Sequence, residues 1–286
     1  CGVVYAKARP RGVAPVAVEA PAFPTPEYVA PPPTEWHLGR EESRRERIVR
    51  IFAVPVVLLL AFGITRADFG HMVARVFASM WIHELGHAVS AWLCGHFALP
   101  GPWRTMVGDE RSAFTIALVL AAWILLAFEG WRRERRLWIV LAIIGMGVQL
   151  VGTFGLARST ARMLFTFGGD AGCFVLGALL MVTFYGRADG HLRKSWLRWG
   201  FLVIGAIAFM DAADTWWGAL RDVDKIPFGQ IEGVGLSDPV KLTETHGWSV
   251  TQMTRRYVGV SLVSLTAVAV AYVLGLFSDG SEGEDA

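Results

Sequence analysis

Residues 72–94 read MVARVFASMWIHELGHAVSAWLC, an apolar run that contains His83-Glu84-Leu85-Gly86-His87. The run has roughly the 20 apolar residues that a membrane-spanning helix needs. Residues four apart lie on one face of a helix, so the imidazoles of His83 and His87 can bind a single Zn²⁺. Glu84 lies at the edge of that face, where it can accept a proton from a water at the metal. Ionisable groups inside an apolar helix are costly and usually functional, so we predict a zinc site; the alternative is that they only hydrogen-bond to neighbouring helices.

The composition of the chain is that of a membrane protein. Of its 286 residues 53% are hydrophobic and 18% are charged, and the mean hydropathy is +0.43. Soluble domains carry about 25% charged residues. We therefore expect an integral, multi-pass protein of a bacterial inner membrane. The net charge of +2 gives no reason to expect a nucleic-acid partner, and the three cysteines form no C-x-x-C pair that would indicate a zinc ribbon.

Length and hydropathy predict an all-α fold, a polytopic bundle of about seven membrane-spanning helices. A disordered Pro- and Ala-rich arm at 1–39 is expected to precede a membrane domain at 40–278, with an acidic tail at 279–286. The distribution of Lys and Arg slightly favours a cytoplasmic N-terminus. The predicted spans are 51–65, 72–94, 113–130, 137–157, 170–186, 199–217 and 257–277.

A catalytic zinc site usually has three protein ligands and one open position. With seven spans, the loops 95–112, 158–169 and 218–256 share the membrane side on which the helix of His87 ends. Asp170 is then the best third ligand, because it is expected to open the fifth span on that side. Glycines beside it allow a close approach of backbones, although an Asp at this position can equally cap a helix.

Three other acidic residues are candidates for the site. Asp211 and Asp214 lie one turn apart in an apolar span, where they can support a ligand from outside, move protons, act as the ligand or join helices. Glu110 follows the metal helix and is either a ligand or a solvated loop charge. The pattern H-E-x-x-H-x-x-G-x-x-H is excluded, because positions 90 and 93 are Ser and Leu.

The segment His83-Glu84-Leu85-Gly86-His87-Ala88 resembles the site-2 protease family of intramembrane zinc metalloproteases, over roughly residues 72–186. The resemblance implies an active site inside the membrane nearer the cytosolic face, with an Asp ligand on a later helix, here Asp170. The chain departs from the family in having no Asn, no proline shortly before Asp170, an additional span before that residue and no inserted recognition domain.

The expected function is zinc-dependent cleavage of transmembrane protein substrates within the lipid bilayer. His83, His87 and Asp170 would hold Zn²⁺, and Glu84 would be the catalytic base. Two alternatives stay open. In a channel or transporter the same side chains, with Asp211 and Asp214, would line an ion path. In a catalytically inactive scaffold the protease-like fold would serve only to bind partners.

Overall fold

The computed structural model describes residues 35–186, 195–231 and 235–277, with side chains from residue 43 onwards. Residue contacts divide the chain into two units, 1–42 and 43–286. Most of the predicted arm and all of the predicted tail lie outside the described residues. Residues 35–39, which were expected to belong to the arm, form the start of a helix.

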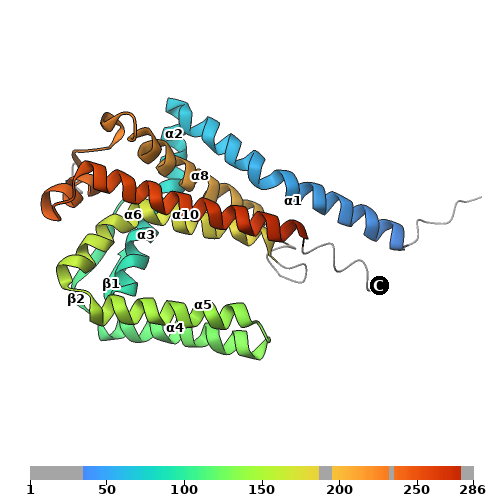
Figure 1. Ribbon diagram of the computed structural model, residues 1–286, viewed down its shortest axis with the longest axis horizontal. Coiled ribbons are helices and arrows are strands. Elements are labelled where there is room, and N and C mark those ends of the chain that lie inside the picture. Colours follow the sequence, from blue (N-terminus) through green and yellow to red (C-terminus); the bar gives the residue numbers. More distant parts are fainter. Residues whose placement is uncertain (1–34, 187–194, 232–234, 278–286) are drawn as a thin grey trace, which may run out of the picture. The chain divides into compact units, whose positions relative to one another are not determined.

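The described part of the chain is mostly helical (Figure 1). Two small antiparallel sheets correct the expectation of a purely helical fold: β1 pairs with β2 and β3 pairs with β4. The reversal between β1 and β2 falls at Gly101-Pro102, a pair that favours turns. The helices are α1 (Glu35–Arg66), α2 (Asp68–Ala74), α3 (Met80–Leu93), α4 (Ala113–Arg132), α5 (Arg136–Leu150), α6 (Arg158–Val182), α8 (Leu197–Gly218), α9 (Asp238–Val240) and α10 (Val250–Phe277), and the strands are β1 (His96–Pro100), β2 (Thr105–Arg111), β3 (Gln230–Ile231) and β4 (Gly235–Leu236).

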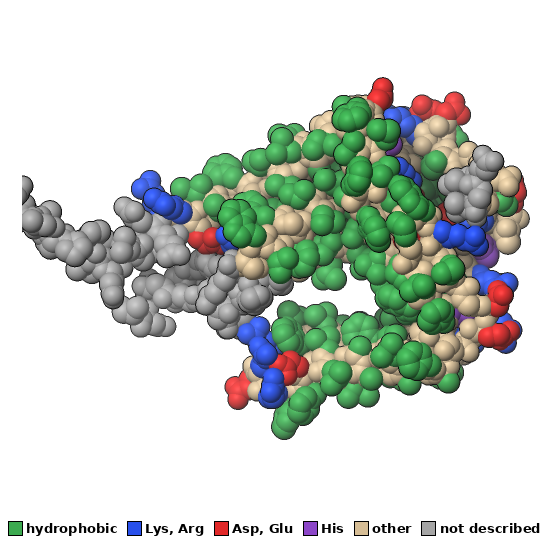
Figure 2. All heavy atoms as spheres, turned by 180° about the vertical axis from the view of Figure 1, so that it is seen from behind, with side chains coloured by type: hydrophobic (Ala, Val, Ile, Leu, Met, Phe, Trp, Pro, Cys, Tyr) green, Lys and Arg blue, Asp and Glu red, His purple; other side chains and the backbone are tan. Residues whose placement is uncertain are grey.

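Five helices in the described residues are long and apolar enough to cross a membrane. They match five of the seven predicted spans. Apolar side chains cover the flanks of the long helices, and charged side chains gather at their ends (Figure 2). This is the distribution expected of a bilayer protein. The five segments are Arg44–Arg66, Ala113–Arg132, Arg136–Gly155, Arg158–Tyr185 and Val250–Phe277.

One end of the bundle is held together by polar contacts from the first helix. The guanidinium of Arg50 donates to the carbonyls of Gly275, at 2.7 Å, and of Gly186, at 3.1 Å. Arg198 donates to the carboxylate of Glu46 at 2.8 and 3.1 Å. The start of α8 and the ends of α6 and α10 therefore lie beside residues 46–50 of α1.

The predicted second span, 72–94, does not run from one end of the bundle to the other. The chain enters this region after Arg66, which pairs at 2.9 Å with Asp214 near the end of α8. It leaves into the β1–β2 hairpin, where Glu110 accepts from Arg158 at the start of α6 at 2.7 Å. Both points lie at the end of the bundle opposite Glu46. The segment consists of α2, a π-helical stretch at Arg75–Ser79 and α3. Its Arg75, His83 and His87 side chains contact carboxylates on other elements.

This path corrects the sequence-based topology. The prediction placed the N-terminal end of the first span and the loop after His87 on the same side, whereas residues 46–50 and the hairpin lie at opposite ends. The count of Lys and Arg over alternating loops therefore no longer supports an orientation. The other missing span, 199–217, forms α8, which is helical throughout but carries Asp211 and Asp214.

Helices α3 and α6 pack so closely that only glycine fits between them. A Cβ atom on Gly86 would overlap the carbonyl oxygen of Gly168, and one on Gly172 would overlap Cα of Gly86. A Cβ atom on Gly169 would lie 2.5 Å from Cε1 of His83. Glycines lower helix stability, but here they let two backbones meet, as small residues do in membrane bundles. This contact places α6 directly against the imidazoles of α3.

Candidate metal centre

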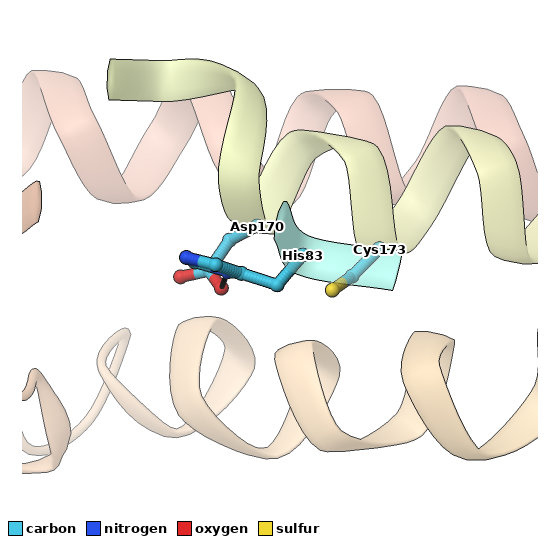
Figure 3. Close-up of side chains that lie close together, drawn as sticks. All are labelled: His83, Asp170 and Cys173. Atoms are coloured by element: carbon cyan, nitrogen blue, oxygen red, sulfur yellow. Dashed lines mark hydrogen bonds and ion pairs between the residues drawn. The ribbon is translucent and has the colours of Figure 1, made fainter. Parts of the chain in front are cut away.

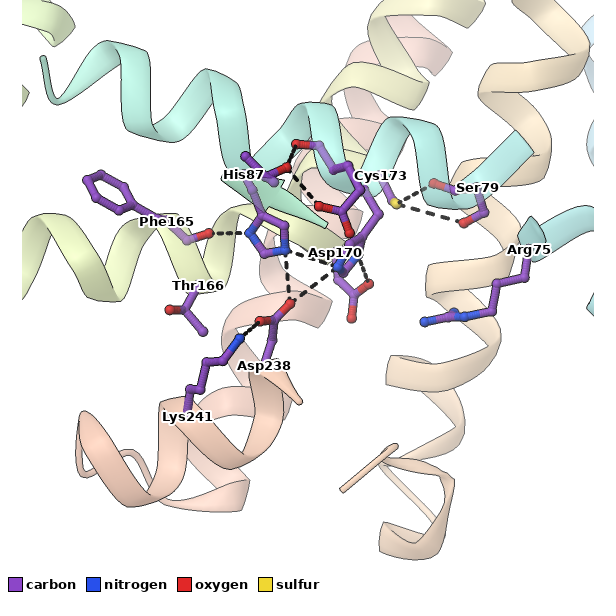
Figure 4. Close-up of polar contacts among 12 residues, drawn as sticks. Arg75, Ser79, His87, Phe165, Thr166, Asp170, Cys173, Asp238 and Lys241 are labelled. Carbon is purple, nitrogen blue, oxygen red and sulfur yellow. Dashed lines mark hydrogen bonds and ion pairs between the residues drawn. The ribbon is translucent and has the colours of Figure 1, made fainter. Parts of the chain in front are cut away.

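Three side-chain atoms that could bind one metal ion lie close together, two from α3 and one from α9. Nε2 of His83 lies 3.1 Å from Nε2 of His87, and Oδ2 of Asp238 lies 3.2 and 3.0 Å from these two nitrogens (Figure 4). In a tetrahedral zinc site with bonds of about 2.0–2.1 Å, neighbouring donor atoms are about 3.3 Å apart. The three atoms therefore approximate one face of such a tetrahedron.

The other nitrogen of each imidazole, Nδ1, contacts an oxygen atom on α6. Nδ1 of His87 lies 2.6 Å from the carbonyl oxygen of Phe165, which can only accept, so this nitrogen donates. Nδ1 of His83 lies 2.9 Å from Oδ1 of Asp170. Partners of this kind fix the ring orientation, so that each Nε2 can bind a metal once the metal displaces its proton. Both imidazoles are thus prepared to bind through Nε2.

Asp170 occupies a different place from the one predicted. It lies in the middle of α6, which begins at Arg158, so it neither opens a span nor caps a helix. Its Oδ2 accepts a hydrogen bond from Nε1 of Trp216 at 2.8 Å, and its Oδ1 faces the rear nitrogen of His83. Asp170 as the third ligand stays a prediction, but Asp238 is better placed for that role.

Sequence reasoning missed Asp238. It placed the loop 218–256 on the membrane side of the site but proposed no ligand from that loop. Burial alone would raise the pKa of the Asp238 carboxyl, but the charge of His87 and hydrogen bonds from His83 and His87 hold this pKa well below its usual value. Lys241 lies 3.2 Å from Oδ1 of Asp238. The available signal was Ser237-Asp238-Pro239, a typical helix start, which by itself does not indicate a metal.

Glu84 is buried, with 4% of its surface exposed, and lies against the β1–β2 hairpin. The hydroxyl of Thr105 lies 2.8 Å from the carbonyl oxygen of Glu84 and 2.7 Å from its Oε2. The hairpin thereby holds the carboxylate beside the imidazoles. Thr105 was not identified from the sequence, because nothing in the chain marks a strand as a partner of α3.

A cavity of about 850 Å³ opens onto these groups. Its walls come from α3, from α6, from the hairpin and from the segment after α8. Ligand-binding clefts in proteins typically measure about 300–1,000 Å³, so the cavity has the size of a binding site. The lining includes His83, Glu84, His87, Asp170 and Asp238, together with Trp103, Thr105, Phe228 and Gln230.

The remaining candidates lie away from the three converging atoms. Asp211 is buried and contacts Ser79 at 2.5 Å, His71 at 2.8 Å and Arg75 at 3.0 Å. Asp214 pairs with Arg66 and, at 3.6 Å, with Lys225. These contacts fit the interpretation of both as polar links between helices. Glu110 is 67% exposed and pairs with Arg158, as expected of a solvated charge, although it lies in β2 rather than in a loop.

The donor set fits Zn²⁺. Two imidazole nitrogens and one carboxylate oxygen are ligands found in catalytic zinc sites, and all three residues line the cavity. Mg²⁺ and Ca²⁺ prefer ligand sets made of oxygen alone.

No family model, curated protein or solved structure matches the chain.

Proposed function

We propose that the chain is a zinc-dependent endopeptidase that cleaves membrane protein substrates within or beside the bilayer. The observation that carries the proposal is the convergence of His83, His87 and Asp238 beside a buried glutamate. The resemblance of residues 83–88 to the site-2 proteases supports the same reading. Five apolar helices of membrane-spanning length are consistent with substrates in the membrane.

The proposed ligands are Nε2 of His83, Nε2 of His87 and Oδ2 of Asp238. When bound, zinc would act as a Lewis acid that polarises a peptide carbonyl and lowers the pKa of water. Asp170 would orient His83, and the carbonyl of Phe165 would orient His87. With zinc bound, these partners would favour the tautomer of each ring that carries its proton on Nδ1 and none on Nε2.

Glu84 is proposed as the general base. Its carboxylate would take the proton of the attacking water and later donate it to the leaving amine. Thr105 would keep the carboxylate in one orientation during both steps. A helical substrate must unwind before cleavage, because its amides are otherwise hydrogen-bonded within the helix. The extended stretch would lie in the cavity between the hairpin and residues 227–230 and 235–238.

The first test measures zinc and proteolysis on the detergent-purified full-length chain. We expect one zinc per chain, lost in Asp238→Asn and kept in Glu84→Gln. Asp109→Asn is the matched control, because Asp109 also lines the cavity but is paired with Arg162 at the surface. The substrates are labelled casein and a panel of transmembrane peptides. Glu84→Gln should lower the cleavage rate about 10²–10⁴-fold.

Three outcomes would overturn the proposal or its details. A Glu84→Gln protein that cleaves like the wild type would exclude the proposed base. Zinc retained in Asp238→Asn and lost in Asp170→Asn would return the third-ligand role to Asp170. Absence of zinc together with ion flux in proteoliposomes would favour the channel or transporter.

A further inference from the structure

A second set of metal-binding atoms lies behind His83, on the side away from Asp238. Cys173 follows Asp170 by three residues on α6, so both side chains point from one face of the helix toward α3 (Figure 3). One ligand atom each from His83, Asp170 and Cys173 lies within 4.8 Å of the other two. The proposed catalytic ligand set does not use the thiol.

We propose that His83 Nδ1, Asp170 and the Cys173 thiolate form a second metal position, which takes a soft or borderline divalent cation such as Zn²⁺, Cd²⁺ or Co²⁺. A thiolate and an imidazole select these ions over Mg²⁺ and Ca²⁺. Zinc–sulfur bonds of about 2.3 Å and zinc–nitrogen bonds of about 2.0–2.1 Å put such donors about 3.5 Å apart. Nδ1 of His83 and Oδ1 of Asp170 are already 2.9 Å apart, so the movement toward a metal would fall mainly on the thiol of Cys173.

The present partners of the thiol leave it free to make this movement. Sγ of Cys173 lies 3.9 Å from Oγ and 3.8 Å from the carbonyl oxygen of Ser79, and sulfur makes only weak hydrogen bonds (Figure 4). Arg75 lies on the same side, and its nearest carboxylate partner is Asp211 at 3.0 Å. Metal binding would displace the thiol proton to water in the cavity, which Asp170 lines.

The two positions compete for one imidazole. A neutral imidazole that binds metal through Nε2 keeps its proton on Nδ1, and one that binds through Nδ1 keeps it on Nε2. An ion in the thiolate position therefore withdraws His83 from the position shared with His87 and Asp238. Excess soft metal should therefore inhibit proteolysis. This inhibition rests on the proposed function, whereas the metal position does not.

Cobalt spectroscopy tests the position directly, since sulfur-to-cobalt charge transfer gives a near-ultraviolet band that nitrogen and oxygen ligands do not give. The chain has three cysteines, so Cys1→Ser with Cys94→Ser leaves Cys173 as the sole thiol. In this background excess Co²⁺ should produce the band, and Asp238→Asn should strengthen it by weakening the competing position. Adding Cys173→Ser should abolish the band.

The proposal would be overturned if the sole-thiol protein lacked the band both with and without Asp238→Asn. It would also be overturned if the band survived in Cys173→Ser. If Cys173→Ser does not fold, ¹¹³Cd NMR of the sole-thiol protein replaces it: a cadmium resonance in the range of sulfur ligation supports the position, and one in the range of nitrogen and oxygen ligands alone contradicts it. Neither readout depends on peptide cleavage, so failure here is distinguishable from failure of the protease proposal.

Discussion

The hydroxyl of Thr105 contacts both the carbonyl oxygen and the carboxylate of Glu84, at 2.8 and 2.7 Å. Thr105 begins β2, and Glu84 lies in the second turn of α3. One side chain of the hairpin thus fixes both the backbone and the functional group of the proposed base. The hairpin, which the sequence did not reveal, is therefore part of the site and more than a connection between helices.

Replacement of Thr105 should affect catalysis and leave metal binding intact. Thr105→Val keeps the shape and removes the hydroxyl, so the Glu84 carboxylate loses its fixed orientation. Partners of this kind contribute about 10–100-fold to activity, and we expect a loss of the cleavage rate in that range with zinc content unchanged. Thr105→Ser is the matched control and should stay near the wild-type rate. Equal rates for the Val and wild-type proteins would contradict the role of Thr105.

The indole of Trp216 should influence zinc affinity through Asp170 and His83. Trp216→Phe removes the donor that lies 2.8 Å from Oδ2 of Asp170. We expect zinc affinity, measured by competition with a chelator of known affinity, to fall about tenfold. Trp217→Phe is the control, because it removes an indole hydrogen bond to Ser261 instead. The same loss in both variants would indicate a general packing effect.

Gly86→Ala should force α3 and α6 apart, because the added methyl group overlaps the carbonyl of Gly168. Overpacking of this kind typically costs about 1–3 kcal/mol of folding free energy. We expect that loss in denaturant unfolding in detergent, together with weaker zinc binding. Gly147→Ala, on α5 with nothing within 4 Å of the new methyl group, should unfold like the wild type. Wild-type stability of Gly86→Ala would show that the helices separate easily.

Asp211 should matter for folding and not for the metal. Asp211→Ala removes the carboxylate that accepts hydrogen bonds from Arg75 and Ser79, so these two groups lose that acceptor inside the bundle. Hydrogen bonds to charged groups contribute about 1.5–3 kcal/mol, and we expect a loss of that size in unfolding free energy at full zinc content. Asp214→Asn disturbs pairs with the more exposed Arg66 and Lys225 and should cost about 1 kcal/mol or less. A drop in zinc affinity at unchanged stability would instead place Asp211 in support of the ligands.

The sequence predicted the parts of this structure that depend on local pattern. His83, Glu84 and His87 lie on a helix as expected, because a four-residue spacing has one geometric meaning there. Five predicted spans correspond to long apolar helices, since bilayer thickness sets their length. The failures concern relations between distant segments. Residues 72–94 have the apolar content of a span, and only their packing against α6 and α8 reveals that they do not cross the bundle.

The third ligand shows the same limit. Asp170 and Asp238 both belong to regions that sequence reasoning placed near the site, and no local signal ranks one above the other. The choice depends on which nitrogen of His83 each carboxylate faces, and that is fixed by the contact of α3 with α6. Glycines at 86, 168 and 172 make this contact possible, but their partners cannot be found without the three-dimensional arrangement.

The excursion of residues 68–93, which starts and finishes at one end of the long helices, has a consequence for the bond that would be cut. If the chain is the protease that we propose, its zinc would lie at the level of Trp216, which is close to the end of α8, and so nearer to one membrane surface than to the other. A substrate would then be cleaved near one terminus of its membrane segment, so one product would carry only a few residues of that segment and the other would keep nearly the whole hydrophobic stretch. The first product would leave the membrane, whereas the second would stay in the lipid.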